Sequence, residues 1–124
     1  MAAVLKVSGF SGTAIDYKIV EFDNTNTPTS AIQENVTGTS GAWYSLVCTV
    51  TGGTDVFVRL WDGATPTLGT DPPTWTFLVV AGQTERIEVP TGVAFTQLNL
   101  AITGDAQPLN ATAPSACTVA IVCS

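Results

Sequence analysis

The side chains that most often carry enzyme chemistry are scarce in this sequence. It contains no histidine, and therefore lacks the usual general base of serine and cysteine hydrolases and the commonest zinc ligand. Its three cysteines, Cys48, Cys117 and Cys123, do not have the CxxC spacing of structural zinc sites or dithiol redox motifs. Three cysteines also form no dense disulfide framework. We therefore expect buried, inert thiols, since free cysteine is among the most buried residue types.

Paired carboxylates are the remaining route to catalysis, because glycosidases place two acids across the bond that they cleave. The acids that are near neighbours in the chain form three pairs: Glu21 with Asp23, Asp62 with Asp71, and Glu85 with Glu88. Each pair falls in a loop or at the end of a predicted strand, where acids commonly form turns and increase solubility. We predict that the protein is not an enzyme and has no catalytic residues.

Loops rich in Asp and Asn offer oxygen ligands that suit calcium. They are Asp23–Asn26 and the segments around Asp55, Asp62 and Asp71, and none resembles an EF-hand. Asp and Asn also occupy turns because they hydrogen-bond to their own backbone. Glycine-rich phosphate loops are absent, since Gly52–Gly53 is followed by neither a helix pattern nor a Lys-Ser/Thr pair. We expect no cofactor and no metal, and calcium binding by one of these loops stays an open alternative.

Tryptophan and proline residues mark the candidate contact surface. Trp43, Trp61 and Trp75 are able either to form an aromatic platform for a sugar or to fill a core or a subunit contact. Each lies within an apolar strand pattern, which favours core or interface. The loop Gly63–Pro73 contains three prolines and two glycines and is expected to be ordered. The candidate interface residues are Trp43, Trp61, Pro66, Pro72, Pro73 and Trp75.

Short segments rich in β-branched and aromatic residues recur along the chain, with Gly, Pro, Asn and Asp clusters between them. The predicted strands are Val4–Phe10, Tyr17–Phe22, Trp43–Val50, Val56–Trp61, Thr74–Val80, Arg86–Val89, Leu98–Thr103 and Thr118–Cys123. The pattern places a turn at Pro90–Gly92, and no stretch shows sustained helical periodicity. The sequence predicts a single all-β domain over residues 1–124, an antiparallel β-sandwich or jelly-roll-like fold of about eight strands.

The charge composition limits the classes of partner that this protein is expected to bind. Charged residues make up 11% of the 124 residues, against about 25% in an average protein, and a surface so poor in charge favours burial in an assembly. The net charge is −6 and the four cations, Lys6, Lys18, Arg59 and Arg86, are dispersed. We therefore expect neither nucleic acid nor an anionic membrane surface as a partner. The start of the sequence lacks the pattern of a signal peptide, so we expect that the protein is made in the cytoplasm and is either used there or released by a route other than secretion.

From Trp43 to the C-terminus the sequence resembles a family of small capsid decoration proteins, also called cement proteins, of tailed bacteriophages. The similarity lies in the order and spacing of short sequence segments rather than in an active-site motif. These segments are Val56–Asp62, Ala64–Pro73, Ala81–Gly82, Gly92–Phe95, Leu100–Gly104 and Thr112–Pro114. The shared segments have the character of strands and turns, so no functional residue carries over from the family.

The resemblance implies a β-sandwich virion protein, often trimeric, that binds the major capsid protein lattice on the capsid exterior and stabilises it against internal pressure. It covers residues 43–124, and leaves open whether residues 1–41 complete the sandwich or form a docking arm. The strand patterns at Val4–Phe10 and Tyr17–Phe22 favour completion. The alternative function is a carbohydrate-binding or adhesive module of a phage fibre or bacterial surface protein, suggested by the three tryptophans and the Asn-rich and Asp-rich loops.

Overall fold

Eight strands account for the regular structure of the chain in a computed structural model that describes residues 3–10, 17–107 and 109–124. The strands are β1 (Val4–Phe10), β2 (Tyr17–Asn24), β3 (Gly41–Val50), β4 (Val56–Asp62), β5 (Trp75–Val79), β6 (Thr84–Phe95), β7 (Leu98–Thr103) and β8 (Cys117–Cys123). Within the described residues there is no helix, and hence none long and apolar enough to span a membrane. The predicted all-β class is confirmed.

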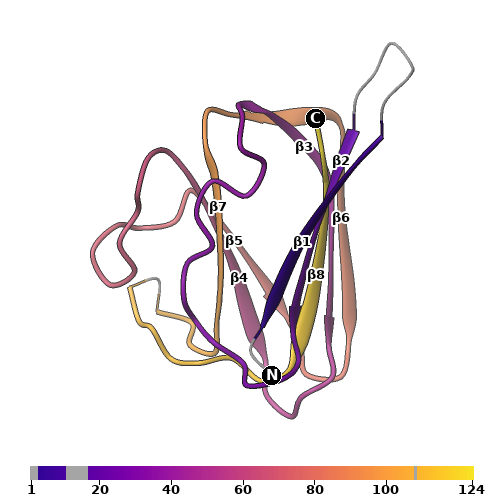
Figure 1. The fold of residues 1–124 in the computed structure, drawn as a ribbon. Helices are drawn as coiled ribbons and strands as arrows, with labels where there is room; N and C mark the ends of the chain where they lie inside the picture. The colour runs from indigo at the N-terminus through magenta and orange to yellow at the C-terminus, as the bar shows by residue number, and fades with distance from the viewer. Residues whose placement is uncertain (1–2, 11–16, 108) are drawn as a thin grey trace.

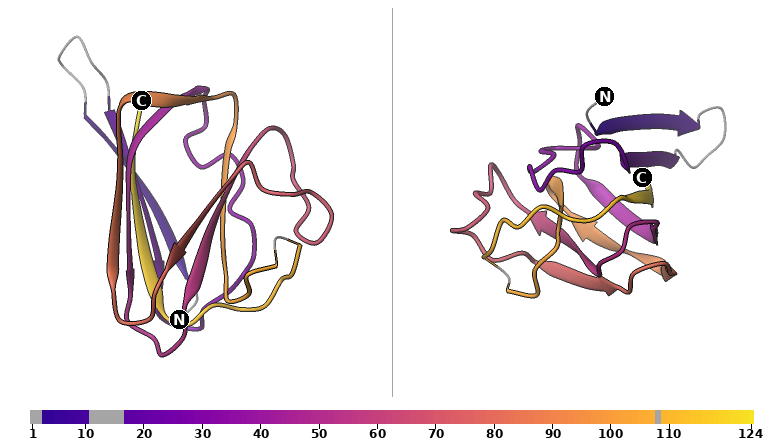
Figure 2. Two further views of the ribbon diagram at one scale, coloured as in Figure 1. Left: turned by 180° about the vertical axis from the view of Figure 1, so that it is seen from behind. Right: turned by 90° about the horizontal axis from the view of Figure 1, so that it is seen from below.

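The strands form two antiparallel sheets that pack face to face (Figures 1 and 2). The five-stranded sheet has the order β1-β2-β8-β3-β6 and the three-stranded sheet has the order β5-β4-β7. The C-terminal strand β8 therefore lies between β2 and β3 and joins the first quarter of the chain to the rest. This two-layer arrangement is the predicted β-sandwich.

Alternation along the strands builds the core between the sheets. In β8 every second residue is fully buried, from Cys117 to Cys123, because successive side chains of a strand point to opposite faces. The other sheet contributes inward residues such as Val58, Leu60 and Leu100, each with 0% exposure. The period-two pattern that identified Val56–Trp61 and Leu98–Thr103 as strands is thus the pattern that fills the core.

All three cysteines are free thiols in this core, as expected from their number and spacing. Burial raises the pKa of Cys48 and of Cys123 to about 12 each and that of Cys117 to about 11. A thiol reacts as its thiolate, so at neutral pH these three side chains serve as small apolar core residues.

The region predicted as a turn at Pro90–Gly92 is instead part of β6, and this prediction is wrong. The strand continues to Phe95, but its register against β3 shifts: Trp43 lies opposite Val93 while Ser45 lies opposite Glu88. Four residues of β6 therefore face one residue of β3, which makes a bulge rather than a chain reversal. β6 is the edge of its sheet, where proline is tolerated because the missing N–H leaves no ladder bond unmade.

The segment 25–40 closes one side of the sandwich, between β2 of the larger sheet and β7 of the smaller one (Figure 1). Gln33 and Leu100 exchange two backbone hydrogen bonds of 2.7 and 2.9 Å, and the Val36 N–H donates to the Leu98 carbonyl at 2.9 Å. On the other side, the Lys18 ammonium donates to the Thr37 carbonyl at 3.1 Å. The N-terminal region thus supplies two strands and a covering segment to the same pair of sheets.

Candidate docking surface

Two long loops lie over the outer face of the three-stranded sheet at β4 and β7, while Thr76 and Leu78 of β5 stay exposed. We call Gly63–Pro73 the proline loop and Gly104–Ser115 the C-terminal loop. Both extend from the same side of the molecule, away from the five-stranded sheet (Figure 1). Beneath them, every residue of β7 is buried although β7 is an edge strand. The two loops also approach each other, since a Cβ placed on Gly69 would lie 3.6 Å from the Leu109 carbonyl oxygen.

Outward-facing side chains of the sheet fasten the proline loop. The Trp61 indole N–H donates to the Asp71 carbonyl at 3.0 Å, and the Asn99 side-chain amide donates to the Gly63 carbonyl at 2.7 Å. At the far end of the loop, the Thr74 N–H donates to the Leu60 carbonyl at 2.8 Å. Buried polar groups that are paired in this way hold a backbone in one conformation.

Hydrogen bonds within the proline loop fix its shape further. The Asp71 carboxylate accepts a hydrogen bond from the Thr67 N–H at 2.7 Å, while the Asp71 N–H donates to the Thr67 carbonyl at 2.9 Å. Pro66, Pro72 and Pro73 restrict the backbone φ angle at three further positions. The expectation of an ordered loop agrees with these contacts, because the loop is held at both ends and across its middle.

Arg59 holds the C-terminal loop. Its side chain has 1% exposure and donates to the carbonyl oxygens of Asp105 and Gln107, the latter at 3.2 Å, and to the Thr103 hydroxyl at 3.0 Å. Burial lowers the pKa of Arg59, and the Asp105 carboxylate opposes that shift. An arginine is a strong base even so, and these acceptors let it stay charged inside the protein.

The aspartates singled out in the sequence, Asp23, Asp55, Asp62 and Asp71, act as hydrogen-bond acceptors in turns and loops, and Asp105 does the same. Asp62 accepts from the Thr96 N–H at 2.7 Å, the Thr96 hydroxyl at 2.9 Å and the Gln97 N–H at 3.3 Å. Burial raises the pKa of Asp62, but these hydrogen bonds outweigh it, and the net pKa is lowered. In Asp105, the hydrogen bond from the Gln107 N–H is the main cause of a lowered pKa.

Two of the three acid pairs lie together in the structure, and each of these two pairs lines a separate surface hollow. Asp62 and Asp71 line a depression of about 260 Å³ beside the proline loop, together with Trp61, Gly63, Ala64, Pro66, Pro72 and Thr74. Glu85 and Glu88 do not share such a site, and Glu88 instead forms an exposed ion pair with Arg86 at 3.2 Å. Within residues 3–10, 17–107 and 109–124, no group of three or more Cys, Asp or Glu side chains is placed to hold a metal ion.

Two of the six candidate interface residues lie in the interior. Trp43 and Trp61 have exposures of 2% and 3%, so of the two roles expected for them, core or interface, their indoles fill the core of this chain. Trp43 packs edge-on against Trp75 and Phe77, with ring centroids 6.1 and 5.9 Å apart, so it belongs to the aromatic core. Sequence periodicity cannot separate a core tryptophan from an interface tryptophan, because both lie in apolar strand patterns.

The other four candidate residues retain accessible surface. Pro72 is exposed, while Pro66, Pro73 and Trp75 are half-buried. The three prolines lie together on the proline loop, whereas Trp75 begins β5 and packs against the core. An interface role for these four residues stays a prediction, and the proline loop is the place where three of them are grouped.

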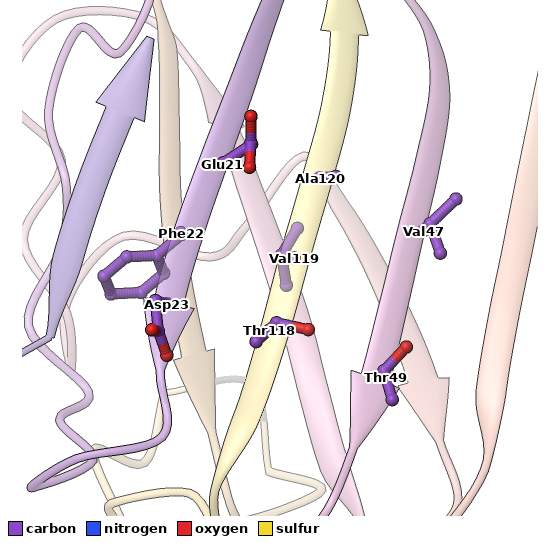
Figure 3. Close-up of a pocket in the computed structure, with 8 residues that line it drawn as sticks. All are labelled: Glu21, Phe22, Asp23, Val47, Thr49, Thr118, Val119 and Ala120. Carbon is purple, nitrogen blue, oxygen red and sulfur yellow. The ribbon is translucent and has the colours of Figure 1, made fainter.

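A second hollow crosses the outer face of the five-stranded sheet and was not identified from the sequence (Figure 3). It has a volume of about 320 Å³ and runs over Ala120 and Thr118 of β8. Glu21 and Asp23 of β2 border it on one side, and Val47 and Thr49 of β3 border it on the other. It exists because Ala120 of β8 has a short side chain between the longer ones of Glu21 and Val47, and that arrangement depends on the strand order.

Comparison of the chain with protein-family models, with curated proteins and with solved structures gave no match.

Proposed function

We propose that this protein is a structural, non-catalytic module that decorates a larger assembly, namely the outer surface of a tailed-phage capsid. The observation that carries the proposal is the pair of loops fastened to the three-stranded sheet by buried side chains, chiefly Arg59, Trp61 and Asn99. The order and spacing of short sequence segments, including Ala64–Pro73 within the proline loop, resemble those of capsid decoration proteins and support the same function. The partner is then the major capsid protein.

A preformed loop suits this role for an energetic reason. Association costs the entropy of ordering flexible segments, and the proline loop is already held by the hydrogen bonds to Asp71, Gly63 and Thr74. Each of the two loops contains one charged residue, Asp71 and Asp105 respectively. Docking would therefore rely on apolar and main-chain contacts rather than on charge.

Self-association belongs to the same proposal. The family resemblance implies a trimer, and a symmetric oligomer that contacts several capsid subunits gains affinity through multivalency even when each contact is small. The sugar-binding alternative loses its main argument, because two of the three tryptophans have no surface to offer a sugar ring.

The test is co-sedimentation of the purified protein with capsids that lack it. We expect the wild-type protein to sediment with capsids and Pro72→Asp to bind about tenfold more weakly, because a charge would enter an apolar contact. Pro90→Asp is the matched control, since Pro90 is also exposed but lies on β6 of the other sheet.

Binding by Pro90→Asp should equal that of the wild type. Equal binding by all three proteins would exclude the proline loop as the docking surface, and failure of the wild type to sediment would contradict the decoration function. In the second case, binding of the wild type on a glycan array would favour the sugar-binding alternative.

A further inference from the structure

The sandwich has four edge strands, and three of them are protected against pairing with another strand. Edge strands present unpaired N–H and C=O groups, so natural proteins cover or interrupt them. β7 is covered by the backbone of Gln33 and Val36. β6 contains Pro90, three charged residues and the bulge opposite Tyr44. β5 is only five residues long.

The fourth edge, β1, carries one lysine but, among the described residues, no proline, bulge or covering segment. All seven of its residues pair with β2 in an unbroken register from Val4 opposite Asp23 to Phe10 opposite Tyr17. Its sequence VLKVSGF contains no proline and one charge, Lys6. Val4 and Val7 have exposures of 48% and 44%, so this strand holds two of the five large apolar side chains that are exposed among the described residues. β1 lies at the margin of the molecule, and within the described part of the chain β2 is its single neighbour in the sheet (Figure 2).

We propose that β1 pairs antiparallel with β1 of a second copy of this chain, about a two-fold axis that places Leu5 opposite Leu5. In this register Val4 lies opposite Lys6 of the second copy, and Val7 lies opposite Ala3. A two-fold axis perpendicular to the sheet keeps the faces of both copies aligned, so their apolar inner faces become continuous. The two five-stranded sheets then form one sheet.

Charge complementarity selects this register. Within one copy, Lys6 lies opposite Glu21 and Val4 lies opposite Asp23. Across the two-fold axis, the row of side chains on the outer face would run Glu21, Lys6, then Val4 and Asp23 of the second copy. Neighbouring strands are about 4.8 Å apart, so the lysine stem can lie over that valine with its ammonium group near the second aspartate. Each lysine is then placed between two acids.

The neighbouring registers lack this complementarity. Moving one copy by two residues in one direction puts Lys6 opposite Lys6, which is repulsive. Moving the register further in that direction puts Lys6 opposite Ser8, which lies beside Ile19 rather than an acid. Moving it in the other direction shortens the overlap further. The Leu5-centred pairing therefore has the best match of charge among these registers, and it aligns Ala3–Val7 of the two copies rather than the whole of β1.

This inference concerns the purified chain alone and does not rest on capsid binding. A two-fold pairing closes after two copies and gives a dimer, which takes the place of the trimer that the resemblance implies. The contact is short, and a small interface gives a weak and concentration-dependent complex. The expected mass therefore rises from 12.8 kDa towards twice that value as the protein concentration increases.

Light scattering of the full chain over a dilution series tests the pairing. Val4→Lys places a lysine opposite Lys6 of the other copy twice per dimer, and should raise the dimer dissociation constant about tenfold. The monomer should tolerate the change, because the new lysine would be half-exposed and opposite Asp23. Val80→Lys is the matched control: Val80 has the same exposure of 48% and lies beyond the end of β5.

The double variant Val4→Lys with Lys6→Val gives the sharpest test of register. It has the composition and charge of the wild type, and its lysine would again face a valine, with Glu21 of the second copy beyond it. We expect it to recover the wild-type dissociation constant. A wild-type monomer at all concentrations, a trimer, an equal loss with Val80→Lys, or no recovery in the double variant would each overturn this pairing. Capsid binding by a monomer or trimer would still leave the proposed function intact.

Discussion

At the scale of single residues, Arg59 illustrates how a charged side chain is accommodated in a protein with few charges. It lies in β4 between two inward-facing residues, Val58 and Leu60, so it points to the outer face of its sheet. That face is buried under the C-terminal loop, and the guanidinium group satisfies loop carbonyls that water would otherwise bind. It also lies 5.5 Å from the centre of the Phe57 ring. Its role is to attach a loop to a sheet.

Arg59→Met should lower the free energy of unfolding by about 3 kcal/mol, because the carbonyls of Asp105 and Gln107 and the buried Thr103 hydroxyl would lose a charged donor. Chemical denaturation followed by tryptophan fluorescence measures this change. Arg86→Met is the control, since the Arg86 side chain is 64% exposed in its ion pair, and its effect should stay within about 0.5 kcal/mol. Similar effects of both substitutions would contradict the proposed role of Arg59.

At the scale of elements, β6 is the strand in which local turn signals and tertiary pairing compete. Pro90 and Gly92 are turn formers, yet the strand reaches Phe95 because its residues on both sides of the bulge pair with β3. Gly92 has a φ angle of 81°, in the left-handed region that favours glycine. The bulge is the form that the expected turn takes when both flanking segments belong to one sheet.

Gly92→Ala should destabilise the fold more than Gly82→Ala, by about 1 kcal/mol. Both glycines have positive φ angles, 81° and 75°, so the backbone strain is similar. They differ in space: a Cβ at position 92 would lie 2.7 Å from a ring carbon of Tyr44, while none of the described atoms lies within 4 Å of one at position 82. Thermal unfolding of the two variants measures the difference, and equal melting temperatures would show that Tyr44 moves aside without cost.

At the scale of the whole molecule, the core is continuous between the two sheets and includes the three thiols. Cys48 lies on β3, whereas Cys117 and Cys123 lie on the neighbouring strand β8, and all have 0% exposure. Their raised pKa values mean that the folded protein keeps thiol protons that the unfolded chain releases at high pH. Stability from this source is complete below the ordinary thiol pKa and decreases as the pH rises towards 11.

Thiol labelling at pH 8 should therefore report unfolding. We expect modification of the three native cysteines to be slower than in denaturant by at least about two orders of magnitude, since it requires opening of the core. Thr91→Cys provides an exposed thiol in the same protein as a positive control. Rapid labelling of a native cysteine in the folded protein would show that the core opens locally near that residue.

Most strands and the faces that they bury could be predicted from the sequence, because both follow from local properties; β6 is the exception, since its bulge is set by pairing with β3. Alternation in Val56–Trp61 and Leu98–Thr103 reflects the two-residue repeat of a strand, and the missing histidine and CxxC motif limit chemistry in any fold. The tertiary structure alone decided which outward side chains are exposed. Trp61 and Arg59 point outward from their sheet, yet loops bury both side chains. The hollow over Ala120 forms because β8 lies between β2 and β3. The position of β1 at the edge of the described sheet likewise follows from the strand order. Such contacts join segments far apart in the chain, and a local pattern carries no information about which segments meet.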